Sequence, residues 1–213
     1  MQHWLFDLDG TLVHTAPDIA RALNVLLARR GLASVPIEQV AQWVGTGSKA
    51  LIRTALAAQD YTASEAELSD LLAQYAADYE AHAVVDSALY PTASATVQAL
   101  AARGDQLAIV TNKLSAVARR VLQHFNLDQY FAVLIGGDDV TLGKPDPMPL
   151  LEACRRMHVT PAQCVMVGDS INDVRAARAA GMRVVAVTYG YNHGQPISAA
   201  MPDRLVDSLA ALL

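Results

Sequence analysis

Cysteine is nearly absent from this chain of 213 residues, which contains only Cys154 and Cys164. Two cysteines are too few for the disulfide framework of a small secreted protein, so we expect both thiols to stay reduced. Charge is also sparse, because Asp, Glu, Lys and Arg together make up only 17% of the residues, and the net charge is −5. This acidic balance argues against a nucleic-acid partner and against an anionic membrane surface.

Long apolar runs are missing too, although hydrophobic residues make up 53% of the chain. No uninterrupted apolar stretch reaches the roughly 20 residues that a membrane-spanning helix needs. Near the start, Asp7 and Asp9 stand where a signal peptide would have its apolar segment. We therefore expect a cytoplasmic protein with a sizeable buried core and no membrane partner.

The most informative segment is DLDGT, which follows a short apolar strand and runs from Asp7 to Thr11. A carboxylate directly after a strand lies at the carboxyl edge of the sheet, where open α/β folds bind ligands. Asp9 adds a second acid one residue later. Gly10 lets the turn tighten and brings backbone N–H groups near an anion, and the Thr11 hydroxyl supplies a further donor. The segment predicts a site for a phosphate together with a divalent metal.

Short β-rich runs alternate with helical segments, which predicts a doubly wound, Rossmann-like parallel sheet of the α/β class. The strands are expected at residues 3–6, 107–110, 133–135, 165–167 and 184–187. After the first strand, residues 16–84 show helical periodicity and no convincing strand. We interpret residues 16–84 as an inserted helical cap domain, and residues 1–15 with 85–213 as the core domain.

Two helices of the cap have recognisable starts. Residues 15–18 are typical of an N-terminal cap before a helix over 19–30, and Thr62 with Glu65 predicts a capping box before a helix over 66–82. Tyr75 and Tyr79 belong to an apolar repeat at helical spacing, which we interpret as core packing.

The cap is expected to join the core through two thin connections, near residues 12–16 and 84–89. Two such connections permit hinge closure.

Further polar side chains follow the other expected strands, so they should meet Asp7 at one edge of the sheet. Thr111 and Asn112 come directly after a strand and are candidates to contact phosphate oxygens, although such a pair is also a common turn. Lys144 lies in a constrained Gly-Lys-Pro loop, where its ammonium group can neutralise a phosphoryl charge.

Asp169 and Asp173 follow the expected strand at residues 165–167 and can converge on one cation. Mg²⁺ favours a few carboxylates together with water and substrate phosphate. The oxygen set offered here consists of Asp7, Asp169 and the backbone carbonyl of Asp9, supported by Asp173.

Substrate choice is expected to lie in the cap, at the loop before a helix over residues 49–58. This loop consists of Gly45, Thr46, Gly47 and Ser48. Its free N–H groups could meet an anionic leaving group when the cap closes, and a plain two-glycine connection explains the same residues equally well. Arg53 could assist, and a solvated face also explains it.

The order of these segments, DLDGTL, TNK, GKP and GDSINDVRAARAAG, resembles the haloacid dehalogenase superfamily over essentially the whole chain. FDLDGTLVHTAPDIARALN, WVGTGSKALI and TYGYNHG are similar to the phosphoglycolate phosphatase group. The resemblance implies that Asp7 is the nucleophile that forms an aspartyl-phosphate, and that Asp9 is first the general acid and then the base. It implies that Thr111 and Lys144 hold the phosphoryl oxygens.

The activity that this resemblance implies is a Mg²⁺-dependent phosphomonoesterase that hydrolyses 2-phosphoglycolate, as a monomer or homodimer. Asp9 favours phosphoryl transfer over dehalogenation, because the dehalogenases of the superfamily lack the second acid. Two departures from the group are Asp146 where a histidine is common, and His14 where an acid is common.

Other functions of the same fold stay open. Phosphatases for sugar phosphates, amino-sugar phosphates or pyrophosphate share this catalytic set, and fold alone does not decide the substrate. A phosphomutase and a catalytically silent phospho-ligand-binding protein are further alternatives. Phosphonate-cleaving relatives use a cap lysine, for which Lys49 is the single candidate.

Overall fold

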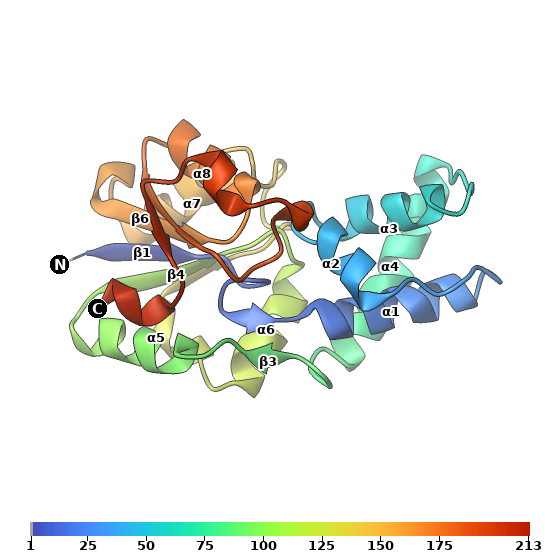
Figure 1. Ribbon diagram of the computed structural model, residues 1–213, viewed down its shortest axis with the longest axis horizontal. Coiled ribbons are helices and arrows are strands. Elements are labelled where there is room, and N and C mark those ends of the chain that lie inside the picture. Colours follow the sequence, from blue (N-terminus) through green and yellow to red (C-terminus); the bar gives the residue numbers. More distant parts are fainter. Residues whose placement is uncertain (1) are drawn as a thin grey trace.

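The computed structural model describes residues 2–213 and has a central six-stranded sheet with a helical part beyond one edge (Figure 1). The strand order is β5-β4-β1-β6-β7-β8, and every neighbouring pair is parallel. The strands are β1 His3–Phe6, β4 Gln106–Val110, β5 Val133–Ile135, β6 Cys164–Gly168, β7 Arg183–Val187 and β8 Arg204–Val206. This confirms the predicted α/β fold, and β8 is the strand of this sheet that the sequence analysis did not predict.

Strand β1 occupies the point where the strand order reverses, since the chain passes to β4 and β5 on one side and later to β6, β7 and β8 on the other. Trp4 and Phe6 pack into one hydrophobic cluster, and Leu5 packs into the other, as the alternation of side chains along a strand requires. In open α/β sheets ligands bind at the carboxyl ends of the strands beside such a reversal. β1 therefore delivers Asp7 to the position where a ligand is expected.

Helices cover both faces of the sheet. α5 and α6 belong to the cluster on one face, and α7 and α8 belong to the cluster on the other. Their bounds are α5 Ala93–Ala102, α6 Ser115–His124, α7 Met148–Met157 and α8 Ile171–Ala179. Short 3₁₀ turns complete the core part: η1 Asp128–Tyr130, η2 Pro161–Gln163, η3 Asn192–Gly194, η4 Ile197–Ala200 and η5 Leu209–Leu212. Cys154 and Cys164 are both buried and free.

Four helices form the part beyond the sheet: α1 Ala16–Ala28, α2 Ile37–Trp43, α3 Ser48–Ala57 and α4 Glu65–Ala81. α1 packs against α2 and α4, and α3 packs against α4. The helical insertion lies at the right of Figure 1, toward the carboxyl ends of the strands. Among the described residues, no helix is both long enough and apolar enough to cross a membrane. The exact division into two domains stays a prediction.

The start of α4 differs from the sequence prediction. Ser64 is the residue before the helix, and its side chain accepts a hydrogen bond from the Glu67 backbone N–H at 3.2 Å. The capping box at Thr62 and Glu65 was therefore wrong by two residues. Ser64 and Thr62 both carry a hydroxyl that can cap a helix, and the local sequence does not decide between them.

The two connections between the insertion and the core pair with each other. β2 Val13–His14 and β3 Ala88–Leu89 form a short antiparallel ribbon. Asp18, fully buried in the first turn of α1, accepts hydrogen bonds from the backbone N–H groups of Val85 and Ser87 and from the Ser87 hydroxyl. Although burial opposes ionisation, these hydrogen bonds hold the pKa of Asp18 below its usual value. The ionised carboxylate thus fastens the second connection to α1.

Candidate active site

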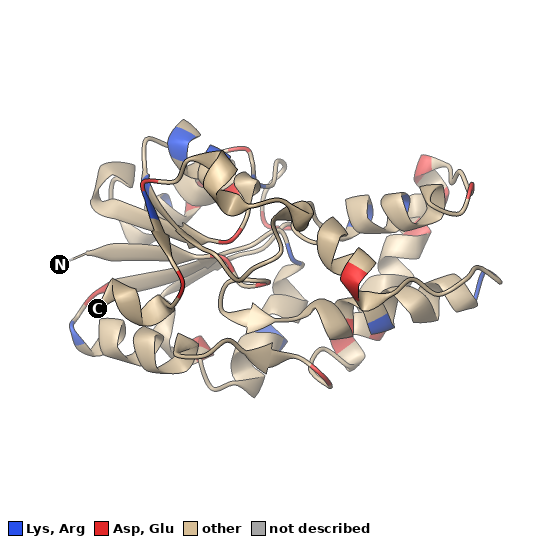
Figure 2. Ribbon diagram, viewed as in Figure 1, with Lys and Arg blue, Asp and Glu red and all other residues tan. Residues whose placement is uncertain are grey.

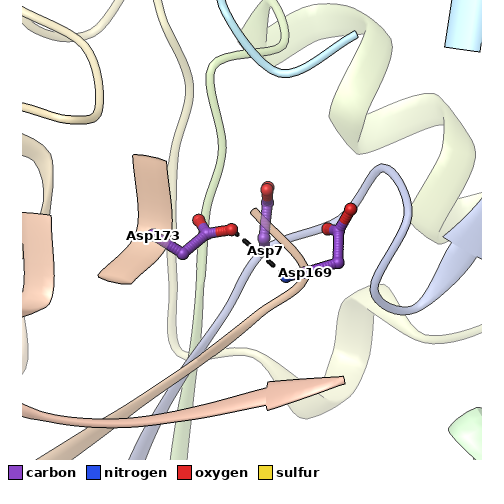
Figure 3. A group of neighbouring side chains, drawn as sticks. All are labelled: Asp7, Asp169 and Asp173. Carbon is purple, nitrogen blue, oxygen red and sulfur yellow. Dashed lines mark hydrogen bonds between the residues drawn. The ribbon is translucent and has the colours of Figure 1, made fainter. Parts of the chain in front are cut away.

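Three buried carboxylates meet at the carboxyl ends of β1 and β6. Asp7 follows β1, Asp169 follows β6, and Asp173 lies in the first turn of α8. Each offers an oxygen, and these oxygens lie within 4.8 Å of one another (Figure 3). All three side chains are buried. The structure thus brings together the three carboxylates that the sequence assigned to a metal.

Glycines make this close approach possible. A Cβ atom at Gly10 would lie 2.4 Å from an oxygen of Asp169, and a Cβ atom at Gly168 would lie 2.3 Å from the carboxyl carbon of Asp173. Gly10 also has a φ of +85°, a left-handed conformation that favours glycine. Any larger side chain at these positions would displace a carboxylate.

Hydrogen bonds hold two of the carboxylates in place. Asp169 accepts from the Thr11 hydroxyl and from the Tyr191 backbone N–H, each at 2.8 Å. One oxygen of Asp173 accepts from the Ser170 hydroxyl and backbone N–H at 2.9 and 3.0 Å, in a capping box at the start of α8. Thr11, a predicted substrate-binding residue, therefore has its hydroxyl directed at Asp169.

Lys144 lies between two of the acids and is only 4% exposed. Its Nζ atom donates to the carbonyl of Val110 and to Asp173, both at 2.7 Å, and lies 3.0 Å from an oxygen of Asp7. Asp173 and Asp7 together raise the pKa of Lys144 above its ordinary value, although burial opposes the shift. The ammonium group of Lys144 therefore stays charged beside the three carboxylates.

Burial opposes the ionisation of two of these carboxyl groups. Burial raises the pKa of Asp7 to about 7, although Lys144 opposes the shift. Burial and the neighbouring carboxylates of Asp173 and Asp7 raise the pKa of Asp169 to about 8. Acidic residues also lie on the loops that leave the central strands toward the insertion (Figure 2). A buried all-oxygen group with an excess of negative charge fits a hard divalent cation.

Within residues 2–213, the group of three close carboxylates does not include Asp9. Its Oδ1 atom accepts from the Thr15 hydroxyl at 2.7 Å, and Lys113 Nζ donates to Oδ1 at 2.9 Å and to Oδ2 at 3.1 Å. Lys113 is 6% exposed and also donates to the Tyr79 hydroxyl at 2.6 Å. The sequence analysis gave Lys113 no role. The signal was its position as the third polar residue after β4, in the TNK segment.

A pocket separates these core residues from the helical insertion. The core contributes Asp7, Asp9, Thr111, Asn112 and Lys113. The insertion contributes Ile19, Trp43, Val44, Gly45, Gly47, Ser48, Leu51, Tyr75 and Tyr79. Tyr75 and Tyr79 are buried, as expected of core residues, and they also line the pocket.

Asn112 joins the core to the cap loop. Its amide nitrogen donates to the carbonyls of Gly45 and Lys144, and its oxygen accepts from the Lys144 backbone N–H, all at 2.8 Å. Asn172 also donates to the Gly45 carbonyl, at 3.2 Å. These bonds already use the amide nitrogen and oxygen of Asn112. Its predicted contact with substrate stays a prediction.

The remaining predicted cap residues lie farther out. Thr46 borders a neighbouring groove, outside the lining of the pocket. Arg53 is exposed and pairs with Glu65 at 2.6 Å, and Lys49 pairs with the same carboxylate at 2.9 Å. The structure therefore places neither cation in the pocket lining.

Tyr191 and His14 pack against each other at the first connection between the core and the insertion. The Tyr191 hydroxyl accepts from the backbone N–H groups of Thr15 and Ala16 and bonds Nδ1 of His14, each at 2.9 Å. Burial lowers the pKa of His14. His14, the last residue of β2, thus lies in the first connection between the core and the insertion, outside the pocket lining.

Comparisons with known proteins agree with this geometry. The profile of a family described as haloacid dehalogenase-like hydrolase matches residues 4–187. A phosphoglycolate phosphatase of Psychrobacter arcticus is 38% identical over 98% of this chain and 93% of its own length. One from Nitrosospira multiformis is 40% identical, over 96% of this chain and 91% of its own. The crystal structure of a predicted phosphoglycolate phosphatase from Haemophilus somnus superposes with a TM-score of 0.93 at 35% identity, covering 100% of this chain and 96% of that one.

Proposed function

The chain belongs to the haloacid dehalogenase-like hydrolase family, and from that premise we propose that it is a Mg²⁺-dependent phosphatase that hydrolyses 2-phosphoglycolate to glycolate and phosphate. The observation that carries the proposal is the buried group of Asp7, Asp169 and Asp173, with Lys144 beside it and Asp9 on the adjacent pocket. Relatives that share about two fifths of its residues carry the name phosphoglycolate phosphatase. Their substrate supports the same assignment here.

Hydrolysis proceeds in two displacements. An oxygen of Asp7 attacks phosphorus, the bond from phosphorus to the glycolate oxygen breaks, and Asp9 gives a proton to that departing oxygen. Asp9 then takes a proton from the water that attacks the aspartyl-phosphate, which releases inorganic phosphate and restores Asp7. Asp9 suits both steps because it lies beside Asp7 on the pocket.

Thr111 donates a hydrogen bond to a phosphoryl oxygen, and Lys144 attracts the phosphoryl group through its charge. Thr111 is 2% exposed at the end of β4, where its hydroxyl oxygen accepts from the Lys113 backbone N–H at 3.2 Å. That bond leaves the hydroxyl hydrogen available for a phosphoryl oxygen. Lys144 supplies a fixed positive charge next to Asp7.

Mg²⁺ would be held by Asp7, Asp169 and Asp173, together with the backbone carbonyl of Asp9. When bound, it would supply positive charge that offsets the negative charge of the phosphoryl group. The roles of these residues, a cytoplasmic location, and a monomeric or homodimeric state remain part of the proposal.

A substrate panel tests the proposal. Phosphate release in Mg²⁺ is measured for 2-phosphoglycolate, sugar phosphates, amino-sugar phosphates and pyrophosphate, and kcat/KM is compared. We expect 2-phosphoglycolate to lead and Asp7→Asn to abolish release. Asp70→Asn, at an exposed acid of α4, is the matched control and should behave as wild type.

Three results would reject the proposal. A lead for a sugar phosphate or pyrophosphate would contradict the substrate. Isomerised product with little free phosphate would indicate a phosphomutase. Binding of 2-phosphoglycolate without turnover would indicate a binding protein.

A further inference from the structure

The pocket has an uneven distribution of charge. The insertion lines it with apolar and aromatic side chains such as Ile19, Trp43 and Leu51, and the core adds the carboxylates of Asp7 and Asp9. Within the described residues 2–213, Lys113 is the only Lys or Arg in that lining. A leaving group with a negative charge meets two carboxylates and an apolar wall here, so its binding depends on that one ammonium group.

The other ammonium group near the site is already committed. Lys144 directs its Nζ atom at a backbone carbonyl and at two carboxylates. Lys113 differs, because two of its hydrogen bonds go to the same carboxylate, that of Asp9. One of those two donors can therefore turn to another oxygen while Lys113 stays bonded to Asp9.

Tyr79 provides a second donor at the same place. Its hydroxyl oxygen accepts from Lys113 at 2.6 Å, and within residues 2–213 the hydroxyl itself donates no hydrogen bond. The Tyr79 side chain is 2% exposed and lines the pocket. Burial raises the pKa of Tyr79, so the hydroxyl keeps that hydrogen. An ammonium group and a free buried hydroxyl therefore stand side by side on the pocket wall.

We propose that Lys113 Nζ and the Tyr79 hydroxyl bind the carboxylate of the leaving group, and that this pair selects phosphomonoesters whose alcohol carries an acid group. The inference deepens the proposed phosphatase function and rests on it. A carboxylate has two oxygens, so it can accept one hydrogen bond from each residue. Esters without the acid group leave the Tyr79 hydrogen without an acceptor and lose the attraction to Lys113.

The cap loop is the competing location for the carboxylate. At Gly45 the carbonyl oxygen already accepts hydrogen bonds from Asn112 and Asn172. The start of α3 offers only partial positive charge from its free N–H groups, whereas Lys113 carries a full charge in a buried setting. Arg53 stays outside the lining, paired with Glu65. Lys113 and Tyr79 are therefore the stronger pair of donors.

The test compares kcat/KM for 2-phosphoglycolate and for ethyl phosphate, which lacks the carboxylate. Lys113→Met should lower the ratio of the two values by about 10- to 100-fold, which is the effect of losing a hydrogen bond to a charged group. Both rates fall in this variant because Lys113 also contacts Asp9, and the ratio isolates the carboxylate contact. Tyr79→Phe should lower the same ratio by a smaller factor of roughly 3 to 10.

Arg155→Met is the matched control, since it removes one positive charge from an exposed ion pair with Glu152 on α7. Its ratio should equal that of wild type. Tyr79→Phe keeps the ring packing, so it tests the same contact even if Lys113→Met does not fold. A wild-type preference for 2-phosphoglycolate that survives in Tyr79→Phe and in folded Lys113→Met overturns this inference and leaves the proposed function standing. A wild type without that preference overturns both.

Discussion

Magnesium and protons should compete for the three buried carboxylates. The pKa of Asp7 is raised to about 7 and that of Asp169 to about 8 in the metal-free protein. Both groups must lose their protons before they can act as ligands. At pH 7, where Asp7 is about half protonated and Asp169 mostly protonated, Mg²⁺ binding should release roughly between one and two protons. Affinity for Mg²⁺ should rise about 100- to 1000-fold from about pH 6 to about pH 8.5.

The same shifts set the sign of the pH dependence of stability. In the unfolded chain these carboxyl groups have ordinary pKa values near 4, so the folded protein binds more protons between about pH 4 and pH 8. The free energy of unfolding of the metal-free protein should therefore fall as pH rises through that window. Added Mg²⁺ should raise Tm more at pH 8 than at pH 6. The metal binds only the folded protein, and its carboxylate ligands are more fully ionised at pH 8.

Isothermal titration of Mg²⁺ in buffers with different heats of ionisation measures the released protons directly. The titration is repeated across the pH range, with Asp70→Asn as the control for loss of an exposed acid. An affinity that does not change with pH, together with no proton release, would refute the reasoning. It would mean that the three carboxylates are already ionised without a metal.

Three further predictions concern the framework around the site. Asp18→Ala leaves the backbone donors of Val85 and Ser87 without their acceptor and should lower the free energy of unfolding by about 2–4 kcal/mol in urea titrations; equal midpoints would contradict this. Gly10→Ala places a Cβ atom 2.4 Å from an oxygen of Asp169 and should weaken Mg²⁺ binding by about 10- to 100-fold in calorimetry, and an unchanged affinity would show that the loop can yield. Tyr191→Phe removes the acceptor for two backbone N–H groups at the start of α1 and should cost about 1–2 kcal/mol of stability; an unchanged thermal melt would rule that out.

Strands with an uninterrupted run of three or more apolar residues were predictable because their pattern is local. β8 was not, since its three residues begin with Arg204 and leave only two apolar side chains in a row, whereas β5 has three. The ribbon of β2 and β3 was missed for a related reason, because two residues carry no period and the partner lies far along the chain.

The residues of the site also differ in how well the sequence predicts their positions. Asp7, Asp169 and Asp173 were predictable because strand ends of a parallel sheet meet at one edge. The position of Lys113 was not, since its contacts with Asp9 and Tyr79 span 104 and 34 residues of sequence. The ion pair of Arg53 with Glu65 was also not predictable, because nearness in sequence to the cap loop does not tell which way a long side chain turns.

The central claim is that Asp7 carries the phosphoryl group during hydrolysis of 2-phosphoglycolate. The most direct measurement is mass spectrometry of peptides from enzyme quenched in acid during turnover with 2-phosphoglycolate and Mg²⁺. We predict a phosphate adduct on the peptide that contains Asp7, and none in the Asp7→Asn variant. Turnover without any adduct on that peptide, or an adduct that persists in Asp7→Asn, would contradict the account.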